Sequence, residues 1–164
     1  MNAYRGKHVS AAARRASSSF HRGRHQVRYP HRRRSLIIGL ILPAKYGRII
    51  NIASMYGMVG NKVAPCSPYH AAKGGVVNMT RGLASEWGKY NINVNAICPG
   101  YFYSPLTKET LDSDFFQQNA QTMIPLSRYG NEGELDTAAL FLASPASSYV
   151  TGVILPVDGG YTAM

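Results

Sequence analysis

The chain has 164 residues, a length that suits one domain, and 45% of them are hydrophobic, which is enough to form a core. Its net charge of +10 is unevenly spread: residues 1–34 carry nine arginines and one lysine without an acid, whereas residues 35–164 carry eight basic and eight acidic residues. The neutral charge of the second part argues against a folded nucleic-acid-binding domain. The two cysteines lack metal-ligand spacing and suit a reducing compartment, and we find no zinc site, no Ser-His-Asp set and no internal repeat.

We expect residues 1–34 to form a basic, disordered arm that precedes a domain of residues 35–164. Three interpretations of the arm are open: a basic tail that neutralises phosphates, an Arg- and Ser-rich transit peptide, or the product of a shifted reading frame or misplaced start. We favour the third, so we do not expect a nucleic-acid partner. The apolar run 36–42 is too short to span a bilayer, and we expect it to pack against the strand that follows.

Two strands and one helix are predicted between residues 47 and 99. Residues 47–53 are an isoleucine-rich run that predicts a buried parallel strand ending at Ser54, and residues 91–97 alternate apolar and polar side chains up to a Pro99-Gly100 turn. Between them, Ser67 is a candidate helix cap and Pro68 fits the first turn. Strand, helix and strand predict a right-handed crossover of an α/β sheet, whose ligands lie beyond the carboxyl ends of the strands.

Tyr69 and Lys73 share one face of this helix because they are four residues apart. A phenol holds its proton too tightly to exchange it near neutral pH, but a nearby ammonium group favours the phenolate. The spacing by itself is also common on ordinary solvated helices. What makes the pair a candidate acid/base catalyst is its position near the sheet edge that carries Ser54.

The remaining elements follow in order. Residues 107–118 read as a helical lid, residues 132–142 as a helix, and residues 153–157 as a last strand. Two sets of apolar and aromatic residues can either line a substrate pocket or pack in the core: Leu106, Leu111, Phe115 and Phe116 in the lid, and Tyr56, Tyr101, Phe102 and Tyr103 nearer the sheet.

Five motifs, in matching order and spacing, resemble the short-chain dehydrogenase/reductase family: Asn51-Ile52-Ala53-Ser54, Tyr69-x-x-x-Lys73, Asn91-Ile92-x-Val94-Asn95, Pro99-Gly100 and Asp158-Gly159-Gly160. The resemblance runs from about Lys45 to the C-terminus and looks most like gluconate 5-dehydrogenases, with carrier-protein ketoacyl reductases second. It implies the second half of a Rossmann-type, doubly wound parallel sheet.

The resemblance also implies an activity, which is hydride transfer between NAD or NADP and a secondary alcohol or ketone. The substrate that we expect first is a sugar acid such as gluconate. Ser54 would bond the substrate oxygen and Tyr69 would be the acid or base. Lys73 would assist Tyr69 and bind the nicotinamide ribose. Pro99 and Gly100 would pass close to the nicotinamide, and Ser104 would contact its carboxamide.

We expect the half of the family's domain that holds the cofactor pyrophosphate to be missing, because no glycine-rich dinucleotide turn appears in residues 1–46. Residues 45–164 alone would then grip only the nicotinamide ribose end. The alternative function is therefore an inactive fragment or a basic-armed binding module. By resemblance we expect a cytoplasmic location and a homo-oligomer, although the shortened domain puts that assembly in question.

Overall fold

The computed structural model describes residues 43–61 and 65–164, so the predictions for the arm and for the apolar run 36–42 lie outside the described residues. Along the chain, the structure contains β1 (Gly47–Ile52), η1 (Met55–Gly57), α3 (Ser67–Trp87), η2 (Gly88–Tyr90), β2 (Ile92–Pro99), α4 (Lys108–Leu111), α5 (Asp114–Met123), α6 (Asp136–Ala143), η3 (Pro145–Ser147), β3 (Ile154–Val157) and η4 (Tyr161–Ala163).

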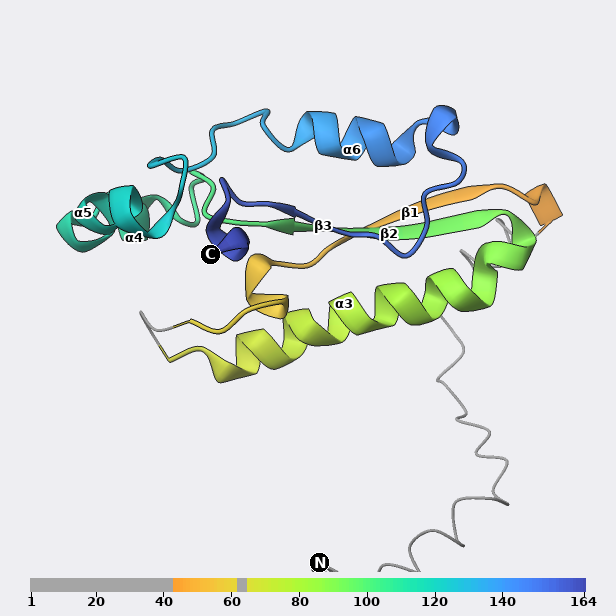
Figure 1. The fold of residues 1–164 in the computed structure, drawn as a ribbon, viewed down its shortest axis with the longest axis horizontal. Coiled ribbons are helices and arrows are strands. Elements are labelled where there is room, and N and C mark those ends of the chain that lie inside the picture. Colours follow the sequence, from red (N-terminus) through yellow and green to blue (C-terminus); the bar gives the residue numbers. More distant parts are fainter. Residues whose placement is uncertain (1–42, 62–64) are drawn as a thin grey trace, which may run out of the picture. The chain divides into compact units, whose positions relative to one another are not determined.

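The described strands form one parallel sheet in the order β1-β2-β3. Ile49 lies opposite Val94, and Ala96 lies opposite Ile154. Helix α3 covers one face and α6 covers the other (Figure 1). This confirms the predicted crossover and the α/β class, because a parallel pair needs a helix to carry the chain back along the sheet.

The core lies on both faces of β2, the middle strand. Val94, Ala96 and Cys98 are fully buried, and on the α3 side they pack in two clusters with residues such as Val77 and Ala84. A strand covered on both faces reads as apolar throughout, but β2 also buries two asparagines, whose amides bond the segment that leads into β3.

The prediction of a buried first strand is right in its parallel pairing and wrong in its burial. Within the described part of the chain β1 pairs only with β2, so its residues are mostly half-buried and Ile52 is 56% exposed. An apolar sheet edge of this kind is a place where another segment can pair.

Two predicted helix boundaries were also wrong. Ser67 is the first residue of α3, not its cap; Cys66 occupies the cap position and makes no side-chain bond there, while Pro68 lies in the first turn as predicted. The single predicted lid is two short helices, α4 and α5, because the Ser113 hydroxyl accepts a bond from the Phe116 amide and starts a new helix. Leu111 is buried in the core, whereas Leu106 and Phe115 are exposed.

Candidate active site

Ser54 lies directly beyond the carboxyl end of β1, where the chain turns into η1. It is 7% exposed, and its Oγ accepts a hydrogen bond of 3.2 Å from the Tyr56 amide, so it caps η1. This is the local backbone role that a strand-end serine commonly takes. Because Oγ is the acceptor in that bond, the hydroxyl hydrogen can still be donated to a substrate oxygen.

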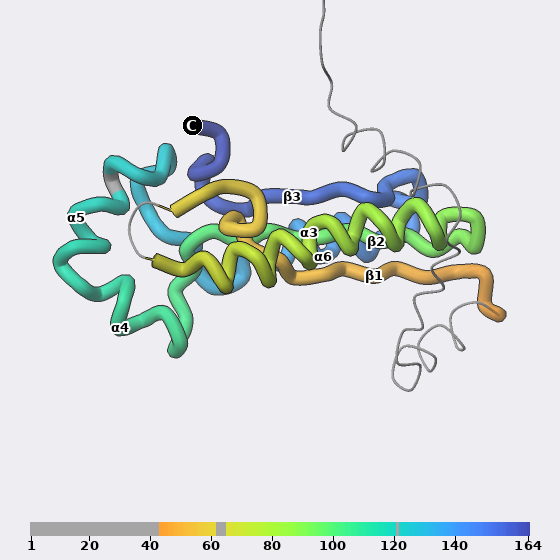
Figure 2. Tube along the Cα trace, turned by 90° about the horizontal axis from the view of Figure 1, so that it is seen from below, coloured from red at the N-terminus to blue at the C-terminus, as the bar shows by residue number. Residues whose placement is uncertain are grey.

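Tyr69 and Lys73 occupy the first two turns of α3, at the same end of the sheet (Figure 2). Tyr69 is 46% exposed, and the Lys73 Nζ lies 5.7 Å from the centroid of its ring. The Lys73 Nζ also donates a bond of 3.2 Å to the carbonyl of Ile52, the last residue of β1. The lysine therefore links the predicted acid/base tyrosine to the strand that leads to Ser54.

Gly57 sets how closely η1 approaches α3. A Cβ at this position would lie 2.7 Å from the Lys73 carbonyl oxygen and 2.8 Å from its carbon. Among the described residues, a Cβ on Gly74 would meet only the Gly57 carbonyl oxygen, at 3.7 Å, and a Cβ on Gly75 would meet nothing within 4 Å. The glycine that the contact requires is therefore the one in η1.

Pro99 and Gly100 end β2 beside the turn that follows β3. A Cβ on Gly100 would lie 2.7 Å from both Cα and Cβ of Asp158, so packing against that turn is enough to require a glycine here. The predicted contact of this turn with a nicotinamide stays a prediction. So does the predicted role of Ser104, whose hydroxyl bonds the Thr107 hydroxyl at 2.9 Å in the turn before α4.

Cys98, near the end of β2, lies next to the Ser54 backbone and is fully buried. Burial raises the pKa of its thiol, and a hydrogen bond from the Ser54 backbone partly offsets that effect. The thiol is therefore neutral at physiological pH, so we assign it to the core.

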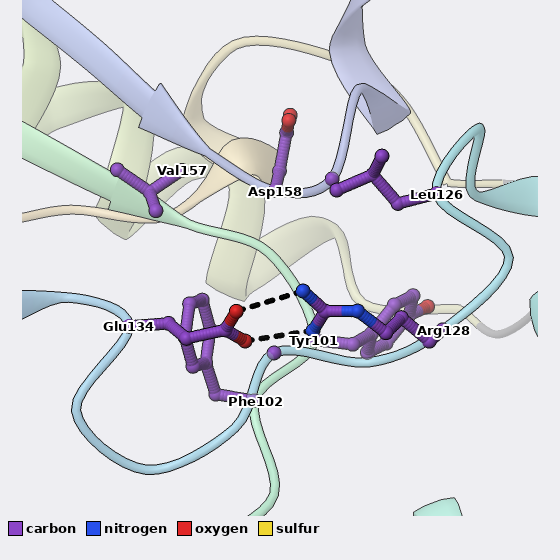
Figure 3. Close-up of a pocket in the computed structure, with 9 residues that line it drawn as sticks. Tyr101, Phe102, Leu126, Arg128, Glu134, Val157 and Asp158 are labelled. Carbon is purple, nitrogen blue, oxygen red and sulfur yellow. Dashed lines mark hydrogen bonds and ion pairs between the residues drawn. The ribbon is translucent and has the colours of Figure 1, made fainter.

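A cavity of about 140 Å³ opens at the carboxyl ends of β2 and β3 (Figure 3). Arg128 and Glu134 cross it as a bidentate ion pair, with both N–O distances at 2.7 Å. The hydrogen bonds from Arg128 lower the pKa of Glu134 to about 2. The Asp158 carboxylate points away from this pair and bonds the terminal turn instead (Figure 3). Because its charged side chains are already paired with groups of the chain, we assign this cavity to the packing between segments and not to a ligand site.

Aromatic side chains gather beyond the sheet edge. Tyr56 and Tyr101, named from the sequence, pack against each other and also contact Tyr161, which sequence reasoning did not select. Tyr103 turns away from them and bonds Asp112. The signal that could have identified Tyr161 is its position just after the Asp-Gly-Gly turn that ends the last strand.

Within the described residues, no group of three or more His, Cys, Asp and Glu side chains could hold a metal ion. The same part of the chain has no helix of the length and apolarity needed to cross a membrane.

The chain matches known proteins of one family, and each match covers about half of the known protein. A family profile described as "Enoyl-(Acyl carrier protein) reductase" matches residues 37–162. The chain is 46% identical over 116 residues to galactitol 2-dehydrogenase (L-tagatose-forming) of Cereibacter sphaeroides, which covers 71% of this chain and 46% of that protein. It is 38% identical over 122 residues to gluconate 5-dehydrogenase of Gluconobacter oxydans (strain 621H), covering 74% and 47%.

A solved structure agrees with these sequence matches. The gluconate 5-dehydrogenase of Burkholderia cenocepacia J2315, crystallised with NADP and tartrate, superposes with a TM-score of 0.74 at 36% identity, covering 78% of this chain and 49% of that one. The chain spans about half the length of the curated relatives it matches.

Proposed function

The chain belongs to the short-chain dehydrogenase/reductase family, and we propose that it takes part in the reversible transfer of a hydride between NAD or NADP and a substrate, which is a secondary alcohol in one direction and a ketone in the other. The observation that carries the proposal is the Lys73 ammonium, which lies beside the Tyr69 ring while bonded to the carbonyl that ends β1. This arrangement brings a proton-transferring phenol and a cation to the sheet edge where Ser54 lies.

Each of the three residues has a distinct role in the proposal. Tyr69 gives a proton to the ketone oxygen in reduction and takes it back in oxidation. Its exposure lets a substrate reach it. Ser54 donates its free hydroxyl hydrogen to the same substrate oxygen and stabilises the negative charge that develops there.

The residues present fit one end of a nicotinamide dinucleotide. Lys73 has three N–H donors, and the Ile52 carbonyl takes one, so two remain for the hydroxyls of a ribose. The cofactor, when bound, would accept or supply the hydride. Pro99 ends β2, Gly100 and Ser104 follow it, and these three residues are the proposed contacts for the nicotinamide. The described residues contain no glycine-rich turn for the pyrophosphate, so the contacts that we propose are confined to the nicotinamide and its ribose.

The proposed substrate is a small polyol or sugar acid. Two of the matched relatives are named for galactitol and gluconate, and the matched structure contains tartrate, a hydroxylated acid. Galactitol, gluconate and tartrate all carry hydroxyl groups on adjacent carbons. A cytoplasmic location and a homo-oligomer remain part of the proposal by resemblance.

The test is turnover of gluconate and galactitol by the full chain, followed by the absorbance of the reduced nicotinamide, with NAD and NADP supplied in turn. Tyr69→Phe should lower kcat by roughly 10²- to 10⁴-fold, because general acid catalysis contributes about that factor. Tyr90→Phe, at the opposite end of α3, is the matched control and should keep full turnover.

Turnover that survives Tyr69→Phe would refute the role of Tyr69. A wild-type chain without turnover on either substrate and with no saturable binding of NADPH would refute the proposed function and favour the alternative of an inactive fragment.

A further inference from the structure

Three tyrosines lie just beyond the carboxyl ends of the three described strands. Tyr56 follows β1 in η1, Tyr101 follows the end of β2, and Tyr161 opens η4 after β3. Both views of the chain place η4 beside η1 at this end of the sheet (Figures 1 and 2). Parallel α/β sheets bind ligands at this edge. We call these three side chains the tyrosine triad.

The rings of the triad form a closed triangle. The ring centroids are 6.2 Å apart for Tyr56 and Tyr101, 6.2 Å for Tyr56 and Tyr161, and 6.0 Å for Tyr101 and Tyr161, each pair nearly perpendicular. The Tyr56 ring also lies 5.1 Å from the ring of His70, which directly follows Tyr69 in α3. The triad therefore adjoins the helical turn that carries the proposed acid/base residue.

The hydroxyls of the triad can still bond an outside molecule. The Tyr56 hydroxyl bonds that of Tyr101. Three phenols own three hydrogens and this bond uses one, so two hydrogens and several lone pairs remain. None of the three side chains is fully buried, so a ligand can reach them.

The Tyr56 and Tyr101 phenols are neutral at physiological pH. Burial raises the pKa of Tyr56, helped by its hydrogen bond to Tyr101, and burial also raises the pKa of Tyr101. A neutral phenol both donates and accepts, as does each hydroxyl of a sugar alcohol. The triad is thus matched to hydroxyl groups, whereas a site for a bare carboxylate would be expected to carry a cation.

We propose that the tyrosine triad is the part of the substrate site that binds the hydroxylated carbon chain of a polyol or sugar acid. The phenol hydroxyls bond the hydroxyls of the ligand, and the aromatic faces cover its C–H groups. This inference rests on the proposed function, since it assigns to the same site the residues that select its substrate class.

The backbone holds the triad in place before a ligand arrives. The Asp158 carboxylate accepts bonds from the amides of Gly160 and Thr162, at 2.9 and 3.0 Å, which fix the turn that carries Tyr161. The Tyr56 amide donates to the Ser54 Oγ, so a ligand held by Tyr56 lies next to the serine proposed to bond the reacting oxygen. Preorganised groups of this kind bind with a smaller loss of side-chain entropy.

The test is calorimetric titration of the full chain with gluconate and with galactitol, in the presence and absence of saturating NADP. Hexanoate is the control ligand, because it has a carboxylate and a six-carbon chain without hydroxyls. We expect Tyr56→Phe to weaken gluconate and galactitol binding about tenfold, since one net hydrogen bond of about 1–1.5 kcal/mol corresponds to roughly that factor. Tyr161→Phe should weaken it less, and Tyr149→Phe, at a fully exposed tyrosine, should change nothing.

Equal affinity in the wild type and the phenylalanine variants of the triad would overturn the inference, as would a wild type that binds neither ligand with or without NADP. If circular dichroism shows that Tyr56→Phe does not fold, Tyr161→Phe in the terminal turn decides the matter. Turnover is measured separately. Ligand binding without turnover refutes the proposed function alone, whereas turnover with an unchanged KM in the triad variants refutes the triad alone.

Discussion

Gly57→Ala tests whether the close approach of η1 to α3 holds the site together. The added Cβ would lie 2.7 Å from the Lys73 carbonyl oxygen and 3.1 Å from the Gly74 nitrogen, and both are backbone atoms that cannot rotate away. The backbone of Gly57 is outside the left-handed region, so alanine meets no conformational penalty and the contact alone is tested. Overpacking of this kind costs about 1–3 kcal/mol.

The assay is urea unfolding of the wild type, Gly57→Ala and a matched control, Gly60→Ala, in which the new Cβ meets no atom of the described residues within 4 Å. We expect the free energy of unfolding to fall by about 1–3 kcal/mol for Gly57→Ala. The control should stay within about 1 kcal/mol of the wild type, because an alanine without a clash mainly restricts the unfolded chain. Equal midpoints for the two variants would show that the approach of η1 to α3 is looser than described and would refute the reasoning.

Three further predictions concern the rest of the domain. Hydrogen bonds from Arg128 and from the Asn131 amide lower the pKa of Glu134 from 4.5 to about 2, so the stability they contribute is present above pH 4.5 and is lost as the pH falls toward 2. In thermal unfolding, Glu134→Gln should therefore melt at a lower temperature than the wild type at pH 6 and at the same temperature near pH 2. Ellman's reagent should label one thiol in the native chain, the half-buried Cys66, and two in denaturant, because Cys98 is fully buried; two equivalents in the native state would contradict this. Asn95→Ala should lower the free energy of unfolding by about 2–4 kcal/mol in a urea titration, because it removes two buried hydrogen bonds and leaves the Val153 amide without its acceptor.

The order of the strands and of the helix between them was predictable from the sequence because it depends on local patterns. The isoleucine-rich run and the alternating run each predict a strand, and the segment between them predicts a helix. The parallel pairing of the two strands follows from the length of that connection. The spacing of Tyr69 and Lys73 put them on one face, and the structure places the Lys73 ammonium beside the Tyr69 ring.

The tertiary structure alone decided which groups meet across the sheet edge. Tyr56 and Tyr161 are about a hundred residues apart in the sequence, and no local pattern indicates that their rings touch. The glycine needed beside α3 is Gly57 in η1, because the Lys73 carbonyl of α3 occupies the space where a Cβ would lie. Periodicity and propensity act between neighbours, so they indicated the type of the main strands and helices but not the division of the lid into α4 and α5. The detailed environment of the site arises from contacts between segments, since packing within about 4 Å joins residues that the sequence separates.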